Sequence, residues 1–440
     1  MKDSIYNNIL TIEGKHTVIF NSFSGKFTIL RDNTSIDRKT KLSDFVKEHP
    51  AYLEIFKSNN ILVEDDIDET ALLQKRIEDT DFDDSFYILN INPTTDCNFH
   101  CWYCYENHVE GSKMSSETVA DIIRFIDRLL DENKTIKQFS LSFFGGEPLL
   151  YYKQVVAPII AHADKACESK EIGFDIGFTS NGYLITDEMV EELKPHNSHF
   201  QITLDGGPEH HDNTRFTKGG VPSFDRIVSN IILCSENGIP VNVRINYTDK
   251  NIDSCKKILD YFIKDEGGIF DNISFDFQRV WQQRTNKGDD AEETASAIRD
   301  AFRNAGYNVH TNYLLRDVRY SCYGDKRNHV LINYDGMAYG CTARDFNEQN
   351  SIGRLNHDGE IKYDLEKYER RFTAKVSKPI CRQCRIAPLC GGGCRQSCVE
   401  TLHHDGCNLG YTEEDKDKKI LSLLEHMMLD SDKSNKSNSK

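Results

Sequence analysis

The cysteines of this sequence are the residues most suited by type and spacing to carry out chemistry. Eleven of the fourteen fall into three groups. The groups are Cys97, Cys101 and Cys104; Cys322 and Cys341; and Cys381, Cys384, Cys390, Cys394, Cys398 and Cys407. In a reducing compartment, grouped cysteines indicate metal or redox chemistry rather than a disulfide framework. Cys167, Cys234 and Cys255 stand alone, and we expect them to be small buried residues of helices.

The first group has the spacing Cys97-x3-Cys101-x2-Cys104. Three thiolates can hold three irons of a [4Fe–4S] cube and leave the fourth iron open to a small molecule, whereas fully ligated clusters take four cysteines. A zinc site is the alternative, with His100 or His108 as a further ligand. Zinc sites, however, usually pair Cys-x2-Cys units or add histidines at set spacings. The spacing therefore favours an iron–sulfur cluster with one open position.

Composition narrows the class of protein. The chain has 440 residues and a net charge of -16, which argues against a nucleic-acid binder and against attraction to anionic membranes. It contains no run of eighteen apolar residues, and residues 1–10 show no signal-peptide pattern. We therefore expect a cytoplasmic protein with no membrane and no nucleic-acid partner.

Alternating strands and helices are predicted over residues 86–307, directly around the first cysteine group. The expected strands are 86–92, 138–144, 172–179, 199–204, 241–247 and 272–277. An amphipathic helix is expected over 116–131, with Ser116 as its N-cap. Six such βα units predict a parallel α/β sheet, either open or curved into a partial (β/α)6 barrel, with the chemistry at the carboxyl ends of the strands.

The segments on either side of 86–307 have different compositions. Residues 1–63 carry a hairpin signal around 22–25 and short helical patterns, which suit a winged-helix-like module. Residues 64–85 are strongly acidic and predict a solvated linker. Beyond the α/β region we expect a metal-dependent, cysteine-rich domain over 308–412, a helix over 413–429 and a disordered tail over 430–440.

The cysteine loop after the first strand, with Tyr103 before its last cysteine, resembles that of the radical SAM superfamily. The second strand ends in Gly145-Gly146-Glu147, similar to the GGE motif of that superfamily. Ser180 and Asn181 end the third strand, Thr203 ends the fourth where relatives usually have serine, and Arg215 follows. The resemblance implies that these residues bind S-adenosylmethionine (SAM): Tyr103, Gly145, Gly146, Glu147, Ser180, Asn181, Thr203 and Arg215.

The resemblance also implies a reaction. A reduced cluster would cleave SAM reductively to methionine and a 5′-deoxyadenosyl radical, which takes hydrogen from an unactivated C–H bond. The protein would position the groups and exclude water, while the cofactor brings the chemistry. The sequence by itself identifies no further catalytic residue.

The later cysteines resemble the SPASM domain, an extension of radical SAM enzymes that modify peptides and proteins. By position, Cys322, Cys341 and Cys394 would ligate a first auxiliary [4Fe–4S] cluster, and Cys381, Cys384 and Cys390 a second. Cys407 is the favoured last ligand of the second cluster and Cys398 the alternative, and Cys398 could instead complete the first. Three [4Fe–4S] clusters and SAM are therefore the cofactors implied. A structural zinc domain is the alternative, but it would leave several cysteines unused.

Two families of relatives compete for the substrate. Maturases of ribosomally made peptides (RiPPs) often add an N-terminal module that captures a precursor's leader peptide, which residues 1–63 resemble, and they install thioether or carbon–carbon cross-links or related changes. Sulfatase maturases make formylglycine and carry Asp after the cysteine equivalent to Cys341, where this chain has Thr342. We therefore expect a radical SAM/SPASM peptide maturase whose partners are a precursor peptide and an electron donor such as flavodoxin or ferredoxin. An iron–sulfur electron carrier or scaffold is the non-enzyme alternative.

Overall fold

The chain folds into two compact units. The computed structural model describes residues 1–12, 16–30, 36–265, 267–280, 282, 290–310 and 317–437. The first unit comprises Met1–Asp83, Tyr313–Arg327 and Glu366–Lys440, and the second comprises Asp84–Asn312 and Asn328–Leu365. Each unit therefore combines segments that are far apart in the sequence.

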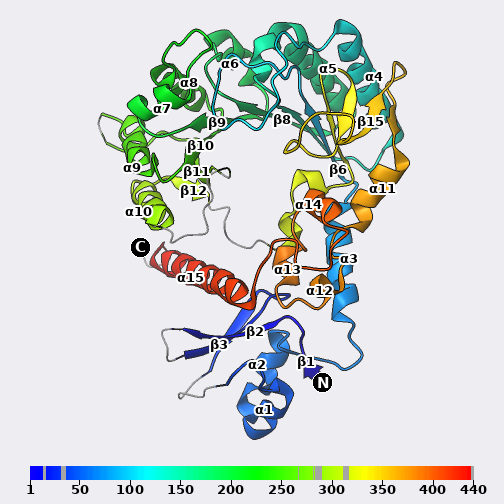
Figure 1. Ribbon diagram of the computed structural model, residues 1–440, viewed down its shortest axis with the longest axis vertical. Coiled ribbons are helices and arrows are strands. Elements are labelled where there is room, and N and C mark those ends of the chain that lie inside the picture. Colours follow the sequence, from blue (N-terminus) through cyan, green and yellow to red (C-terminus); the bar gives the residue numbers. More distant parts are fainter. Residues whose placement is uncertain are drawn as a thin grey trace. The chain divides into compact units, whose positions relative to one another are not determined.

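A curved parallel sheet forms the centre of the second unit (Figure 1). Its parallel strands follow one another in sequence order: β6 (Phe86–Ile91), β7 (Gln138–Phe143), β8 (Gly173–Ser180), β9 (Ser198–Leu204), β10 (Val241–Tyr247), β11 (Ile273–Arg279) and β12 (Asn308–His310). The six expected strands are confirmed to within two residues at each end. The short strand β12 was missed because its sequence, Asn-Val-His, has a single apolar residue.

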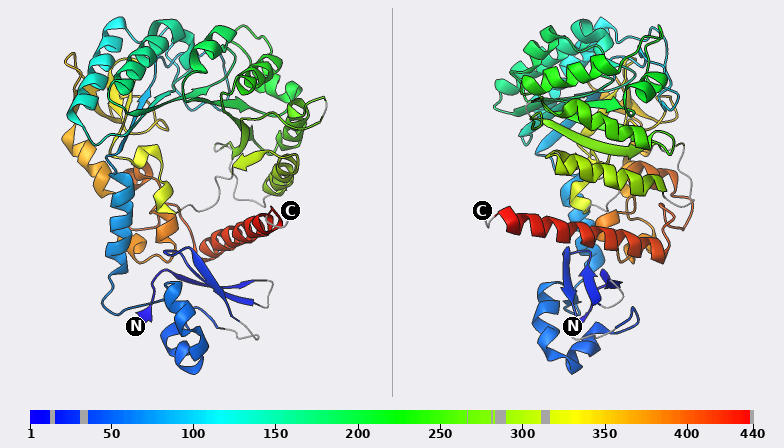
Figure 2. Two further views of the ribbon diagram at one scale, coloured as in Figure 1. Left: turned by 180° about the vertical axis from the view of Figure 1, so that it is seen from behind. Right: turned by 90° about the vertical axis from the view of Figure 1, so that its left-hand side faces the viewer.

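Helices cover the outer, convex face of this sheet, as Figure 1 and Figure 2 both show. They are α4 (Ser116–Glu132), α5 (Ala157–Glu168), α6 (Asp187–Leu193), α7 (Pro208–Thr214), α8 (Phe224–Glu236), α9 (Ile252–Cys255) and α10 (Asp290–Asn304). Helix α4 buries Val119, Ile122 and Ile126, which share one face at helical spacing. Its N-cap is Ser115 rather than the expected Ser116, since the Ser115 side chain accepts from the N–H of Thr118.

Cys167, Cys234 and Cys255 lie in α5, α8 and α9, and all three are buried, as expected. No helix within the described ranges is long and apolar enough to cross a bilayer.

Four further strands extend the sheet beyond β6. Strand β13 (His329–Ile332) pairs with β6 in parallel, and β14 (Met337–Tyr339), β15 (Ser351–Leu355) and β16 (Ile361–Tyr363) follow in antiparallel order. Residues 328–365 therefore belong to the second unit, whereas the sequence grouped 308–412 as one domain. The reason is the pairing of β13 with β6. All four residues of β13 are buried, and the strand covers the edge of the sheet that β6 would otherwise expose.

The first unit begins with small sheets and short helices. Its elements are β1 (Lys2–Asp3), β2 (Asn7–Ile12), β3 (His16–Asn21), β4 (Lys26–Ile29), α1 (Leu42–Glu48), α2 (Leu53–Ser58) and β5 (Leu62–Val63). Strands β3 and β4 form the expected hairpin, and β2 adds to β3 on its other side. Leu42, Phe45 and Phe56 pack in a shared apolar core.

Part of the apolar core around residues 1–63 is supplied by residues from the other end of the chain. Leu10, Val18 and Phe20 of the sheet pack in one cluster with Ile420 and Leu424. The predicted N-terminal module is therefore continuous with the C-terminal segment, a contact between residues about 400 positions apart that no local pattern could reveal.

The predicted acidic linker 64–85 instead contains helix α3 (Glu69–Asp81). Its last residue, Asp81, is fully buried, and its carboxylate accepts from Arg395 Nη2 at 2.7 Å, Lys375 Nζ at 3.1 Å and Ser321 Oγ at 2.6 Å. A second buried carboxylate, Asp325, lies 3.0 Å from Lys375 Nζ. The cations that make this burial tolerable come from much later in the chain, so a local count of acids could not predict it.

The C-terminal part of the first unit is helical. Helices α11 (Leu365–Thr373), α12 (Pro379–Arg382), α13 (Ala387–Cys390) and α14 (Arg395–Glu400) precede α15 (Glu413–Ser437). Helix α15 runs past the expected end at 429 and into the predicted disordered tail, of which 438–440 lie outside the described residues. The segment has a low-complexity composition, but it contains no glycine or proline to end the helix.

The Asp81 network gives a prediction for stability. Asp81→Ala leaves the buried cations Lys375 and Arg395 without this partner, so we expect the free energy of unfolding of the first unit to fall by roughly 3–5 kcal/mol. The control is Asp79→Ala on the same helix, whose pair with Lys75 is exposed and should change stability by less than about 1 kcal/mol. Urea denaturation followed by circular dichroism measures both, and equal shifts for the two variants would contradict the assignment.

Candidate active site and cysteine centres

The first cysteine group lies on the loop that follows β6, and Asp96 holds this loop in place. Asp96 Oδ1 accepts from the N–H of Cys97 at 2.7 Å and from Lys218 Nζ at 2.8 Å. Its other oxygen accepts from the N–H of Gly111 at 2.8 Å, which ties the two ends of the loop together. Sequence analysis missed Asp96, although an acid directly before the first cysteine is a visible signal.

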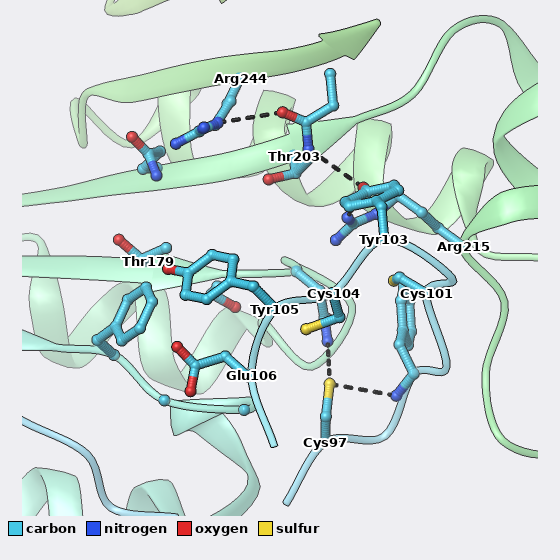
Figure 3. Close-up of a pocket in the computed structure, with 18 of the residues that line it drawn as sticks. Cys97, Cys101, Tyr103, Cys104, Tyr105, Glu106, Thr179, Thr203, Arg215 and Arg244 are labelled. Carbon is cyan, nitrogen blue, oxygen red and sulfur yellow. Dashed lines mark hydrogen bonds between the residues drawn. The ribbon is translucent and has the colours of Figure 1, made fainter. Parts of the chain in front are cut away.

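Cys97, Cys101 and Cys104 all line one cavity at the carboxyl ends of the parallel strands (Figure 3). Burial raises the pKa of Cys97 to about 12, and the nearby carboxylate of Glu147 adds to the shift. Burial also raises the pKa values of Cys101 and Cys104. Without metal these groups are thus thiols at neutral pH, and they must release protons to become ligands.

The thiols can be compared with the two kinds of site expected from the sequence, an iron–sulfur cluster and a single zinc ion. Within the described part of the chain, no three Cys, His, Asp or Glu side chains converge as ligands of one metal ion. Each cysteine of an iron–sulfur cluster binds its own iron, so its ligands surround the cluster rather than meet at a point. Of the two histidines considered for zinc, His108 has its Nδ1 atom 2.8 Å from the carbonyl oxygen of Thr95.

Gly145 and Gly146 follow β7 and can only be glycines. A Cβ atom on Gly145, whose φ is +107°, would lie 2.2 Å from the carbonyl oxygen of Thr94. A Cβ atom on Gly146 would lie 2.1 Å from the carbonyl oxygen of Asp96. The backbone after β7 therefore packs directly against the start of the cysteine loop, and both glycines line the cavity.

The carboxylate of Glu147 accepts hydrogen bonds from donors of the protein itself. It is fully buried and accepts from Ser180 Oγ at 2.9 Å, from the N–H of Asn181 at 2.8 Å and from the N–H of Leu149 at 3.0 Å. Burial raises its pKa, while these hydrogen bonds and Arg215 oppose the rise. Glu147 is the one predicted SAM-binding residue absent from the described lining of the cavity, and it instead joins the loops after β7 and β8.

The other predicted SAM-binding residues are brought together. The lining includes Tyr103, Gly145, Gly146, Ser180, Asn181, Thr203 and Arg215, and Figure 3 shows Tyr103 beside Arg215. Arg215 Nη1 donates to the Tyr103 hydroxyl at 2.6 Å, and Asn246 Nδ2 donates to the same oxygen at 3.2 Å. Asn181 Nδ2 donates to Asn98 Oδ1 at 2.7 Å, next to Cys97.

Arg215 brings a buried positive charge to the cavity. Its Nε atom is buried and has no hydrogen-bond partner among the described residues. Burial raises the pKa of nearby Asp205 to about 6, although Arg215 opposes that rise. A buried guanidinium with an unused donor suits an anionic group of a ligand, such as a carboxylate.

Sequence analysis missed further residues that line the cavity: Glu106, Gln201, Arg244, Asn246, Arg279 and Gln282. Gln201, Arg244 and Arg279 lie on β9, β10 and β11. Their signal was available, since polar residues on strands predicted to be buried are unusual. Glu106 follows the last cysteine of the loop by two residues and shows no such pattern.

Four later cysteines line a second cavity, in the first unit: Cys381, Cys384, Cys390 and Cys407. Asn408, Tyr411 and Lys416 also line it. Cys398 is absent from its described lining and is fully buried, with its Sγ atom 3.3 Å from both the carbonyl oxygen of Gly392 and Nδ2 of Asn408. Of the two alternatives for the last ligand, Cys407 is therefore the one that joins the other three.

The remaining cysteines are divided between the units. Cys322 and Cys394 belong to the first unit and Cys341 to the second. The N–H of Arg395, which follows Cys394, donates to Asp325 at 2.8 Å, and Asp325 lies three residues after Cys322. The first two cysteines thus lie on segments that bind one another, while the shared cluster of all three remains a prediction.

Comparison with known proteins finds a family whose model matches part of the second unit. Residues 91–262 match the radical SAM superfamily, and the chain therefore carries a radical SAM domain. Proteins of this superfamily bind a [4Fe–4S] cluster and SAM and act by radical chemistry. The grouped thiols, the glycine backbone and the unused donor of Arg215 fit that pair of groups.

The individual relatives have low sequence identity to this chain. A serine-type anaerobic sulfatase-maturating enzyme of Bacteroides thetaiotaomicron is 27% identical over 175 residues, which cover 38% of this chain and 40% of that protein. The radical SAM cyclopropyl synthase TigE of Paramaledivibacter caminithermalis is 24% identical over 206 residues, covering 44% of this chain and 40% of TigE. The chain thus spans half the length or less of the curated relatives it matches.

Solved structures share the fold. Histidine-tagged anSMEcpe with bound AdoMet aligns with a TM-score of 0.57 at 17% identity, over 77% of this chain and 94% of that one. SuiB of Streptococcus suis bound to S-adenosylmethionine aligns with a TM-score of 0.52 at 16% identity, over 93% of this chain and 98% of SuiB. These alignments establish an α/β radical SAM fold.

Proposed function

We propose that this protein is a radical SAM maturase that modifies a ribosomally made precursor peptide. The observation that carries the proposal is the cavity of the second unit, where the three grouped cysteines, the two glycines and Arg215 all line one space. Such a combination of iron ligands and donors for an amino acid is needed by an enzyme that binds SAM at a cluster, and an electron carrier would not require it.

Each part of the cavity has a role in this proposal. Cys97, Cys101 and Cys104 would hold a [4Fe–4S] cluster, and the Gly145–Gly146 backbone and Arg215 would bind the amino and carboxylate groups of SAM. Thr203 would contact SAM through its hydroxyl. When bound, cluster and SAM together supply a radical able to take hydrogen from a C–H bond of the peptide. The apolar side chains that also line the cavity, Phe99, Phe144 and Val280, would help to exclude water from this step.

The second cavity supports one auxiliary cluster. Cys381, Cys384, Cys390 and Cys407 would each bind one of its irons, and the full set of four suits a cluster with no open position. Cys322, Cys341 and Cys394 would hold another, which brings the proposed total to three. Such clusters could accept the electron that an oxidative cross-link releases, after hydrogen has been taken and a proton lost.

The N-terminal sheet supports a peptide partner. Strand β4 pairs with β3, and no strand pairs with its other edge among the described residues. An extended leader peptide could add to that edge through backbone hydrogen bonds. The likeness to SuiB spans 93% of this chain, and a structure of SuiB bound to its precursor peptide SuiA shares the same fold. A flavodoxin or ferredoxin is the proposed electron donor.

Formylglycine formation is the second candidate. It is favoured by the similarity to sulfatase-maturating enzymes of Bacteroides thetaiotaomicron and Clostridium novyi and by the shared fold of anSMEcpe. Two features favour a peptide maturase instead. Thr342 stands where sulfatase maturases carry Asp, and the likeness to anSMEcpe extends over 77% of the chain, against 93% for SuiB.

A single anaerobic assay tests the function. After reconstitution we expect about twelve irons per chain, because each of three [4Fe–4S] clusters holds four. With reductant, SAM and the precursor peptide encoded beside the gene, 5′-deoxyadenosine should form, and a cross-link should lower the peptide mass by roughly two hydrogen atoms. A change seen only in a sulfatase-derived Cys or Ser peptide would favour the second candidate. Absence of SAM cleavage would exclude both.

The cysteine assignment has its own matched pair of variants. Cys407→Ala removes a proposed ligand of the second auxiliary cluster, and we expect the iron content to fall by up to about four per chain. Cys398→Ala should retain the iron of this second auxiliary cluster, since Cys398 is absent from the described lining of its cavity. Iron analysis and electron paramagnetic resonance measure both. Loss of iron in Cys398→Ala alone would reverse the assignment.

The edge of β4 can be blocked by one backbone change. The N–H of Leu30 donates to Thr17 of β3, so strand alternation turns the N–H of Ile29 away from β3. Ile29→Pro removes that N–H and should weaken precursor binding by about tenfold or more. Ile29→Ala keeps the N–H and should bind like the wild type. Fluorescence anisotropy with a labelled precursor measures both, and equal affinities of the two variants would place the leader elsewhere.

A further inference from the structure

Glu106 lines the cavity of the second unit with a buried carboxylate for which the described residues supply no donor. It lines the cavity two residues after Cys104, and Figure 3 shows it beside Tyr105 and Cys104. Both of its carboxylate oxygens are buried, and neither has a hydrogen-bond partner among the described residues. A buried carboxylate without partners is strongly unfavourable, so its presence needs an explanation.

Glu147 makes the contrast clear. Both carboxylates lie in the same unit, but Glu147 accepts hydrogen bonds from three donors of the protein. The fold thus satisfies one buried acid completely and leaves the other for something else.

The neighbours of Glu106 are bound to other groups. Asp345 accepts from Asn107 Nδ2 at 2.8 Å, and His108 Nδ1 lies 2.8 Å from the carbonyl oxygen of Thr95. A rearrangement of these two side chains toward Glu106 would break those contacts. The missing partner is therefore expected to enter with a ligand.

The charges of the cavity indicate the chemistry of that ligand. Glu106 is the only carboxylate among the described residues of the lining, which also carries Arg215, Arg244 and Arg279. Arg215 donates to Tyr103, and Arg244 donates to Asn246. An anionic group of a ligand can bind these guanidinium groups, whereas a cationic group finds one carboxylate among the described residues of the lining.

We propose that Glu106 binds a positively charged nitrogen, an ammonium or guanidinium group, of a molecule held in this cavity. The inference rests on the proposed function, which supplies two possible sources of such a group. One is the amino group of SAM, and the other is a lysine or arginine side chain of the precursor peptide near the modified residue. The shared chemistry is a charge-assisted hydrogen bond to a carboxylate that has no other partner.

Glu106→Gln is the variant that tests this, because it keeps the shape and removes the charge. We expect the affinity for SAM or for the peptide to fall by about tenfold or more, as loss of a charged hydrogen bond does. The control is Glu110→Gln, an exposed acid on the same loop outside the described lining, which should match the wild type. Calorimetry with SAM and anisotropy with labelled precursor are measured on the iron-loaded protein.

The two binding measurements distinguish whether the charged nitrogen belongs to SAM or to the precursor peptide. A loss confined to SAM binding assigns the site to the cofactor's amino group. A loss confined to the peptide, reproduced by replacing one lysine or arginine of the peptide with glutamine, assigns it to the substrate. Unchanged affinity for both overturns the inference, even if the wild type modifies the precursor. If SAM binding falls while no peptide is modified, the proposed function fails and the inference stands.

Stability supplies a readout that does not need activity. Because no donor among the described residues holds the Glu106 carboxyl, Glu106→Gln should not lower the melting temperature of the ligand-free protein, whereas replacing a residue that supports the fold would lower it. Iron content and its absorption spectrum should remain those of the wild type. If Glu106→Gln does not load iron, Glu106→Asp, which keeps the charge on a shorter side chain, is compared in the same assays. A lower melting temperature in both variants would overturn the inference.

Discussion

The buried carboxylate of Glu147 is the interaction on which the candidate active site depends. Its oxygens accept from Ser180, Asn181 and Leu149, and its own N–H donates to the carbonyl oxygen of Asp96. One residue therefore fixes three loops that follow neighbouring strands, including the loop of the grouped cysteines. The adjacent glycines have the same consequence, because a side chain on either would push the cysteine loop away.

A second buried ionic network organises the first unit. Asp81 ends α3, Asp325 lies three residues after Cys322, and Arg395 directly follows Cys394. Lys375 and Arg395 bind these carboxylates in a setting where neither charge is exposed. The network thus orders segments that carry cysteines before any metal binds. It also joins the helix that leaves the N-terminal sheets to the cysteine-rich segment, so both halves of the first unit depend on the same ions.

The cavity of the second unit uses its charges in two ways. Arg244 of β10 and Arg279 of β11 already bind protein partners, and they present positive potential to a ligand. Among the described residues of that lining, Glu106 is the only carboxylate, and neither of its oxygens has a hydrogen-bond partner. A zwitterionic amino acid, or a peptide with a basic residue, matches that division better than a purely anionic ligand.

The sequence by itself determined the strands β6 to β11, the hairpin of β3 and β4, and the cysteines, glycines and Arg215 of the cavity lining. These follow from local rules: alternating apolar runs define strands, and motifs at their carboxyl ends must meet at one edge of a parallel sheet. Tertiary structure alone decided that Glu147 binds donors of the protein itself, that residues 328–365 join the second unit, and that Asp81 is buried. Each of these depends on partners distant in sequence, whose positions are set by packing, and a local pattern contains no information about them.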